Sequence, residues 1–172
     1  MSLELQERSV NSLSYVRPVA VAYVRAKGPI ATAAPQAWRQ LRSIITGAGA
    51  SQFSVGYGLV YGSLSNPAQM YFEACIEVPH NDDGVHARML ATQTIAGGVH
   101  IASAAVSSHQ SLACALEGLL NDPLIGHGLS VADDRPAIIT YARAMANPYS
   151  KVWALTLNMP LCWASGSQGR AA

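Results

Sequence analysis

The chain has 172 residues, of which 50% are hydrophobic and 12% are charged, and its formal net charge is +1 at pH 7. This composition supplies a substantial core and argues against intrinsic disorder. Nucleic-acid binding needs basic residues clustered to neutralise phosphates, and the sequence has no run of Lys or Arg. No apolar stretch approaches the ~18 residues that span a bilayer. The composition favours a folded domain that binds neither nucleic acid nor a membrane directly.

The cysteines and the N-terminus predict a cytoplasmic location. The N-terminal MSLELQERSV carries acids where a signal peptide needs a basic segment followed by an apolar one. The three cysteines, Cys75, Cys114 and Cys162, are an odd number without metal-ligand spacing, so we expect reduced thiols. No metal site and no cofactor is predicted.

The first half predicts a strand, a helix and two further strands. The helix begins after Thr32, has Pro35 in its opening turn and stops at Gly47. Asn66 and the proline after it form a turn signal between the last two strands. The strand-like runs lie at 19–25, 54–62 and 69–78.

The second half repeats this order. Its helix starts near Ser107 or Ser108, and the sequence NDP at 121–123 ends it. The strand-like runs lie at 98–103, 136–145 and 151–159. The apolar stripe of the helix consists of Leu112, Leu116, Leu119 and Leu120.

Two stretches of the sequence follow the same pattern: NPAQMYFEACIEVP at 66–79 and NPYSKVWALTLNMP at 147–160. They align at an offset of 81, and one residue of slippage in the turn also places Tyr61 on Tyr141. A three-stranded sheet with one helix hardly makes a core alone, so two such halves should pack together about a pseudo-two-fold axis.

The predicted fold class is therefore α+β, a tandem duplication of a βαββ unit. We expect two antiparallel sheets with one helix each and a ligand cleft between the halves. The expected organisation is one domain at 15–163, with halves at 15–79 and 95–163, a linker at 80–94, and flexible termini at 1–14 and 164–172.

Side-chain alternation along the strands predicts an aromatic and acidic face. In the strand at 71–78, one face is apolar and should lie under the helix, whereas the other face contains Glu73 and Glu77. Tyr57 and Tyr61 share a face of the preceding strand. Aromatic walls with a buried carboxylate suit a flat, apolar cation. Ordinary surface packing of these tyrosines is the alternative interpretation.

Four stretches of the first half support a family resemblance: RPVAVAYVRAKGPI, AAPQAWRQL, VGYGLVYG and YFEACIEVP. Together they resemble the GyrI-like small-molecule-binding domain, over roughly residues 15–163. This domain is the effector module of many AraC- and MerR-type multidrug-responsive regulators and of gyrase-inhibitor-like proteins. The resemblance implies a ligand cavity between two βαββ halves. The cavity-lining aromatic residues that it implies are Trp38, Tyr57, Tyr61, Tyr141 and Trp153.

One position departs from the family pattern. Members that bind cations usually have a glutamate two residues before the tyrosine that corresponds to Tyr141, and here that position is Ile139. An isoleucine cannot compensate a buried positive charge. Either Glu73 supplies the carboxylate, or the ligand is neutral.

We therefore expect a stand-alone module, because nothing in the chain resembles a helix-turn-helix. It would sequester or sense an amphipathic aromatic small molecule, either cationic or neutral. No catalytic residue is predicted. One alternative is a protein-interaction module of the gyrase-inhibitor type, with a homodimer or another protein as partner. The other is a hydrolase of electrophilic small molecules that uses Glu73 to activate water.

Overall fold

The computed structural model describes residues 11–47, 55–78, 89–142 and 153–164. The helices are α1 (Ile30–Gly47), α3 (Leu112–Leu120) and the short 3-10 helix η1 (Pro67–Gln69). The strands are β1 (Ser12–Val16), β2 (Val19–Lys27), β3 (Val55–Tyr61), β4 (Tyr71–Glu77), β5 (Ala91–Ile95), β6 (Gly98–Ser107), β7 (Leu129–Val131), β8 (Ala137–Ala142) and β9 (Trp153–Trp163). The predicted α+β class is confirmed.

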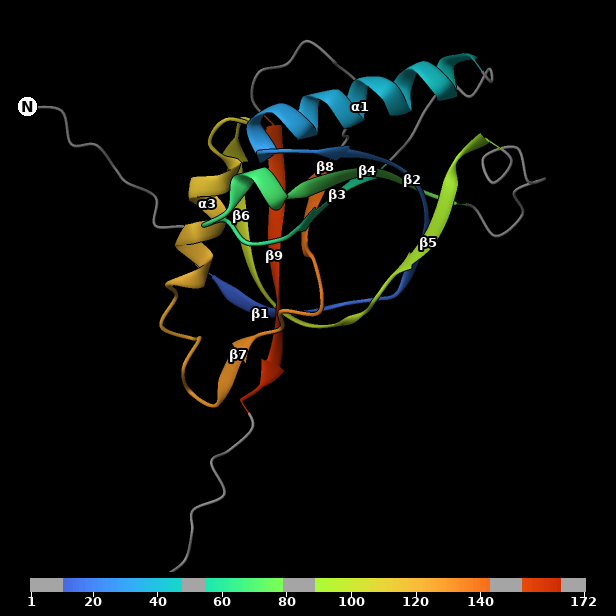
Figure 1. Cartoon of the computed structure of the whole chain (residues 1–172). Coiled ribbons are helices and arrows are strands. Elements are labelled where there is room, and N and C mark those ends of the chain that lie inside the picture. Colours follow the sequence, from blue (N-terminus) through green and yellow to red (C-terminus); the bar gives the residue numbers. More distant parts are fainter. Residues whose placement is uncertain (1–10, 48–54, 79–88, 143–152, 165–172) are drawn as a thin grey trace, which may run out of the picture.

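The strands form one curled antiparallel sheet in the order β1-β6-β9-β8-β3-β4-β2-β5, with β7 paired to β9 (Figure 1). The prediction of two separate sheets was wrong. Strands β3 and β8 pair from Val55 opposite Ala142 to Val60 opposite Ala137, and this ladder joins the two halves into one sheet. Pairing also satisfies the backbone groups that two open strand edges would have left exposed.

The main core lies between the sheet and the helices. The buried residues of α1 recur at helical spacing, as Ala33, Ala34, Ala37, Trp38, Leu41 and Ile45. They pack on β2 and β4, where Ala22, Ala26 and Ala74 are also buried and small, so helix and sheet approach closely. Helix α3 buries Leu112, Leu116 and Leu119 against β6, β9 and α1.

Gly58 in β3 is required by this packing. A Cβ atom at position 58 would lie 2.5 Å from Cζ of Phe72 and 3.2 Å from Cε2 of Tyr141. Both rings are almost completely buried on the helix side of the sheet. A glycine in a strand interior that marks a close approach is a recurrent pattern.

Several element boundaries differ from the sequence predictions. Residues 12–16 form strand β1 on β6, although 1–14 were expected to be a flexible terminus, and β7 was not predicted. Helix α1 begins earlier than expected, at Ile30, and α3 begins later, at Leu112. The later start reflects a turn in which Ser108 O accepts a hydrogen bond from the Ser111 N–H at 3.1 Å.

The linker prediction is tested only in part. Residues 79–88 lie outside the described residues, and the end of the linker forms β5, which is the strand at the sheet edge beside β2. The second Asn-Pro turn, at 147–148, also lies outside them. In the described part of the chain, we find no helix that is both long and apolar enough to cross a bilayer.

Candidate functional site

The most unusual group in the sheet is a carboxylate with no exposed surface. Glu73 lies in the middle of β4 and is 0% exposed. Its Oε1 accepts hydrogen bonds from Nε of Arg25 at 2.8 Å and from Nη2 at 2.5 Å. Its Oε2 accepts a hydrogen bond from Nε2 of Gln93 in β5. The cross-strand register produces this pairing, because Arg25 lies directly opposite Glu73 in the ladder of β2 and β4.

Tyrosine rings surround the ion pair. The guanidinium carbon of Arg25 lies 4.4 Å from the ring centroid of Tyr71 and 5.7 Å from that of Tyr23. Tyr61 stacks on Tyr71 with ring centroids 4.5 Å apart and an interplanar angle of 16°. Contacts of guanidinium with aromatic faces are favourable, and more so when they exclude water. We call Arg25, Glu73 and Gln93, with the rings of Tyr61 and Tyr71, the Glu73 cluster.

The titration behaviour of the neighbouring groups reflects burial and the charge of Glu73. The hydrogen bonds to Glu73 raise the pKa of Arg25. Burial, reinforced by the nearby carboxylate, raises the pKa of Tyr61 and, well above its ordinary value, that of the Cys75 thiol. Tyr57 also has a raised pKa, caused first by burial and then by Glu77. At neutral pH these tyrosines are hydrogen-bonding phenols, and the thiol is protonated.

The predicted site residues divide between the two faces of the sheet. We call the face turned away from α1 the inner face and the opposite one the outer face. Glu73, Tyr57 and Tyr61 lie together on the inner face, with Leu59 and Cys75. Tyr141 and Ile139 pair with Gly56 and Gly58, and lie on the outer face among the core residues below the helices. Trp38 reaches the same core from α1.

The predicted site residues therefore lie on both faces of the sheet rather than on one. The one-residue slippage that aligned Tyr61 with Tyr141 equated residues of opposite faces. Side chains alternate with a period of two, so a shift of one residue transfers a strand's pattern to the opposite face. Without slippage the offset of 81 aligns Tyr57 with Ile138, and these two do share the inner face.

On the outer face, the buried Tyr141 ring contacts both Trp38 and His109. The rings of Trp38 and Tyr141 meet edge to face, with centroids 5.1 Å apart. The Tyr141 hydroxyl lies 3.4 Å from Nε2 of His109. Burial lowers the pKa of His109 to about 4, so the imidazole is neutral at physiological pH. Trp153 begins β9, and its side chain lies outside the described part of the chain.

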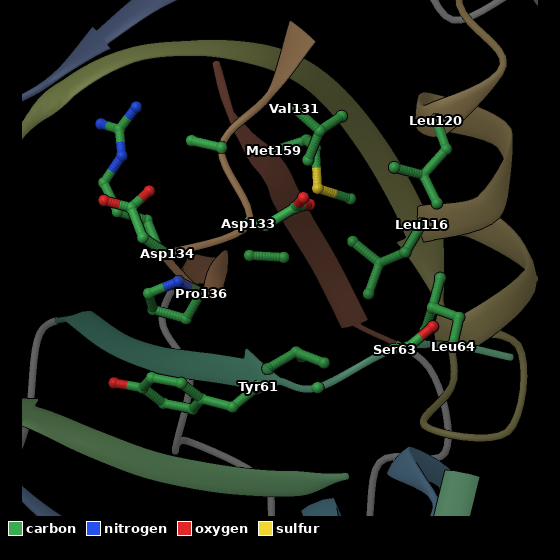
Figure 2. A pocket seen from close by; sticks show the side chains of 15 residues that line it. Tyr61, Ser63, Leu64, Leu116, Leu120, Val131, Asp133, Asp134, Pro136 and Met159 are labelled. Carbon is green, nitrogen blue, oxygen red and sulfur yellow. The ribbon is translucent and has the colours of Figure 1, made fainter. Parts of the chain in front are cut away.

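A groove lies beside α3, mainly on the outer side of the sheet, and Tyr61 is the one residue of the Glu73 cluster among its lining residues. Its volume is about 510 Å³, and Figure 2 shows its walls, with Leu116 and Leu120 of α3 on one side and Pro136 and Tyr61 on the other. Its side chains are mainly apolar, with Asp133 and Asp134 exposed at the rim. The groove is lined by Val60, Tyr61, Gly62, Ser63, Leu64, Leu116, Leu120, Val131, Ala132, Asp133, Asp134, Arg135, Pro136, Ala137 and Met159.

Three members of the cluster, Arg25, Tyr71 and Gln93, were not among the predicted site residues. Arg25 and Tyr23 are two residues apart in β2 and therefore share one face of the strand. This spacing was the signal that could have indicated Arg25 as a site residue. A cross-strand pair of opposite charges is favourable, but recognising it requires the register of β2 on β4. Gln93 lies in the segment that was expected to be a linker, and no local pattern distinguishes it.

Neither a protein-family model nor a curated protein matches the sequence. Solved structures do match its fold. EcmrR in a complex with DNA superposes with a TM-score of 0.69 at 16% identity, over 90% of this chain and 58% of that one. The EcmrR C-terminal domain alone gives a TM-score of 0.65 at 12% identity, over 91% of this chain and 99% of that one. This chain has the fold of that domain.

Two further structures share the fold. SAV2435 bound to tetraphenylphosphonium gives a TM-score of 0.62 at 10% identity, covering 89% of this chain and 94% of that one. A hydrolase from Listeria innocua gives a TM-score of 0.59 at 15% identity, covering 88% and 91%. The resemblance drawn from the sequence is thus supported at the level of the fold. At these identities the function of this chain has to be argued from its own residues.

Proposed function

We propose that this chain binds an amphipathic aromatic small molecule beside the Glu73 cluster, and thereby sequesters or senses it. The observation that carries the proposal is a fully buried carboxylate in the middle of a sheet, held among partly buried tyrosines. A buried ion pair is seldom more stabilising than apolar residues of the same volume. The Tyr61 ring connects this pair to a groove, which favours a role in recognition.

The groove supplies the space for such a ligand. Its volume of about 510 Å³ falls within the range of small-molecule sites, about 300–1,000 Å³. An aromatic body would lie on the apolar walls from Leu64, Leu116 and Met159, and its edge would contact the Tyr61 ring. Tyr61 would then connect the ligand to the Glu73 cluster, because the same ring stacks on Tyr71.

The structural neighbours support binding of this kind. SAV2435 shares the fold and was solved with tetraphenylphosphonium, which carries four phenyl groups on one positively charged phosphorus. EcmrR uses the fold in a protein that also binds DNA, and this chain spans 58% of the EcmrR chain in that complex. For this chain we propose the ligand-binding role alone.

Calorimetric titration with two probes tests the proposal: tetraphenylphosphonium, and the uncharged, three-ringed triphenylphosphine oxide. We expect saturable binding of at least one probe, weakened about fivefold or more by Tyr61→Ala, because a lost aromatic contact is worth about 1 kcal/mol. Tyr15→Ala is the matched control, since this tyrosine is 66% exposed on β1 and lies outside the groove. Absence of saturable binding of both probes would refute the proposal.

The hydrolase alternative is less well supported. Activation of water needs a carboxylate oxygen that can accept its proton. Both oxygens of Glu73 already accept hydrogen bonds from Arg25 and Gln93. Glu73 would have to lose one of these partners before it could act as a base.

A self-association surface is a second candidate function, supported by an exposed apolar patch. Strand β1 ends the strand order, and large apolar side chains are exposed around it: Leu13, Tyr15, Val99 and Trp163. An edge strand of this kind can pair with a second copy of itself. Light scattering after gel filtration would then show a dimer that Tyr15→Lys converts to a monomer. A monomeric wild-type protein at all concentrations would exclude this role.

We also infer an internal duplication. The series β2-α1-β3-β4 and β6-α3-β8-β9 share one order of elements, with η1 inserted in the first and β7 in the second. In each series the last strand pairs with both other strands, and the sheet order is symmetric about the β3–β8 ladder. A structure-based alignment of the two halves without slippage would test this inference, and a failure of α1 to superpose on α3 would contradict it.

A further inference from the structure

Strand β1 has one edge that pairs with no strand in the described part of the chain. It pairs with β6 without interruption, from Ser12 opposite Ala102 to Val16 opposite Gly98, and it ends the strand order of the sheet (Figure 1). The backbone N–H and C=O groups of the other edge are therefore available to another strand. A charge or a proline commonly protects such an edge, but SLSYV at 12–16 contains neither.

The outer face of this edge is apolar. Leu13 and Tyr15 lie opposite Ile101 and Val99, and Ile101 belongs to the core below the helices. Both β1 side chains are more than half exposed, and with Trp163 of β9 they line a groove of about 660 Å³. The strand at the opposite edge of the sheet, β5, instead exposes an alanine and two threonines. Of the two edges, β1 is the one suited to an apolar partner.

Two charges without an opposite charge flank β1. Arg17 follows the strand directly and is exposed. Asn11 precedes the strand and donates a hydrogen bond from Nδ2 to Oδ2 of Asp122 at 2.5 Å, so Asp122 lies beside the beginning of β1. Among the residues that the structure describes, neither Arg17 nor Asp122 forms an ion pair. One end of the strand is therefore positive and the other negative.

This distribution of charge is complementary to itself under a two-fold rotation. If two copies of β1 pair antiparallel with Ser14 opposite Ser14, all five residues of each strand are paired. In this register Arg17 lies opposite the partner's Asn11, and so beside the partner's Asp122. A two-fold axis produces the same contact twice. A shift of the register by two residues would leave part of each strand unpaired and would separate these charges.

The same register joins the apolar surfaces. Leu13 lies opposite the partner's Tyr15, again twice, and these side chains share the outer face with the groove. Tyr15 and Trp163 are 66% and 79% exposed. Because an aromatic side chain buries about 150–250 Å², they offer roughly 200–350 Å² per copy. This is less than half of the ~800 Å² per partner in a standard interface, which indicates a reversible dimer rather than an obligate one.

We propose that the partner of β1 is a second copy of this chain, paired antiparallel about a two-fold axis at Ser14, with Arg17 of each copy against the partner's Asp122. The inference rests on the self-association surface given as the second candidate function, because it assigns that surface its register and its ion pairs. It does not depend on a ligand beside the Glu73 cluster.

A double-mutant cycle tests the ion pair, with the dimer dissociation constant measured by sedimentation velocity over a range of concentrations. Arg17→Gln and Asp122→Asn should each raise this constant about threefold or more, because each removes two attractions per dimer. The double variant should be no weaker than either single variant by more than about twofold, since both remove the same contact. Arg39→Gln, at an exposed position of α1, is the matched control and should leave the constant unchanged.

A cysteine at the two-fold axis tests the register. In a chain whose exposed cysteines are replaced, Cys114→Ser and Cys162→Ser, the substitution Ser14→Cys should give a disulfide-linked dimer on oxidation with copper phenanthroline. Residues directly opposite each other in antiparallel strands are about 4.5–5.5 Å apart, within the range that a disulfide spans. Thr92→Cys in the same background is the control, because it lies in the edge strand β5 and should remain monomeric on a non-reducing gel.

The outcomes separate the register from self-association itself. A wild-type chain that is monomeric at every concentration would refute both. A dimer that Tyr15→Lys dissociates, but that forms no Ser14→Cys disulfide and is unaffected by Arg17→Gln, would overturn the register and the ion pairs and leave the surface standing. Disulfide formation at Ser14→Cys together with additive effects of Arg17→Gln and Asp122→Asn would overturn the ion pair alone.

Discussion

Acidification should destabilise the fold through His109. This side chain is 9% exposed in the turn between β6 and α3, and Nε2 lies 3.4 Å from the Tyr141 hydroxyl. Burial lowers its pKa to about 4 in the folded chain. In the unfolded chain a histidine titrates near its ordinary pKa of about 6.5. The unfolded state therefore takes up a proton at a pH where the folded state does not.

The sign and the magnitude follow from this difference. Stability contributed by neutral His109 is fully present above a pH of about 6.5 and is lost progressively as the pH falls toward about 4. Each unit of pKa difference corresponds to about 1.4 kcal/mol, so the loss at a pH of about 5 is roughly 2 kcal/mol. Burial also lowers the pKa of His100, which adds a loss in the same direction.

Urea denaturation near neutral pH and at a pH of about 5 measures the effect. The comparison is between the wild-type chain and His109→Gln, since glutamine keeps a polar group near Tyr141 without titrating. We expect the free energy of unfolding of His109→Gln to fall by roughly 2 kcal/mol less on acidification than that of wild type. His127→Gln, at an exposed position, should behave as wild type. Equal losses in wild type and His109→Gln would refute the reasoning.

Two further predictions concern packing and thiol reactivity. Gly58→Ala should lower the free energy of unfolding by about 1–3 kcal/mol, because its Cβ would overlap the Phe72 ring. Gly118→Ala should raise the free energy of unfolding by up to about 1 kcal/mol, because a Cβ at this helix position meets nothing within 4 Å. Equal urea midpoints for these two variants would contradict the close packing of β3 on Phe72. Buried Cys75, with its raised pKa, should react with iodoacetamide far more slowly than the two exposed cysteines, as mass spectrometry of the native protein would show. Modification of all three at similar rates would show that the inner face opens readily.

The sequence was most informative about features that one strand or one helix determines by itself. Alternation placed Glu73 on the face opposite Phe72, and Tyr57 with Tyr61, and the structure has these relations. The helical spacing in α3 likewise identified its buried stripe, apart from Leu120, which is 37% exposed. These inferences depend only on the local period of a strand or a helix.

Relations between strands were not predictable in the same way. The partner of Glu73 depends on the register of β2 on β4, and the single sheet depends on the β3–β8 ladder, so neither is encoded in a local pattern. Strand β1 was missed because it is only five residues long and its large apolar residues, Leu13 and Tyr15, are exposed, so its place in the sheet depends on its pairing with β6. The alignment of Tyr141 with Tyr61 misplaced its face, since one residue of misalignment reverses a face.

The most direct test of the central claim is an amide chemical-shift titration of the labelled wild-type chain with triphenylphosphine oxide. We predict saturable shifts for Tyr61, Glu73 and Gln93, which belong to the Glu73 cluster, and none for the edge strand at 12–16. Shifts confined to that edge strand, or no shifts at all, would contradict a ligand site beside Glu73.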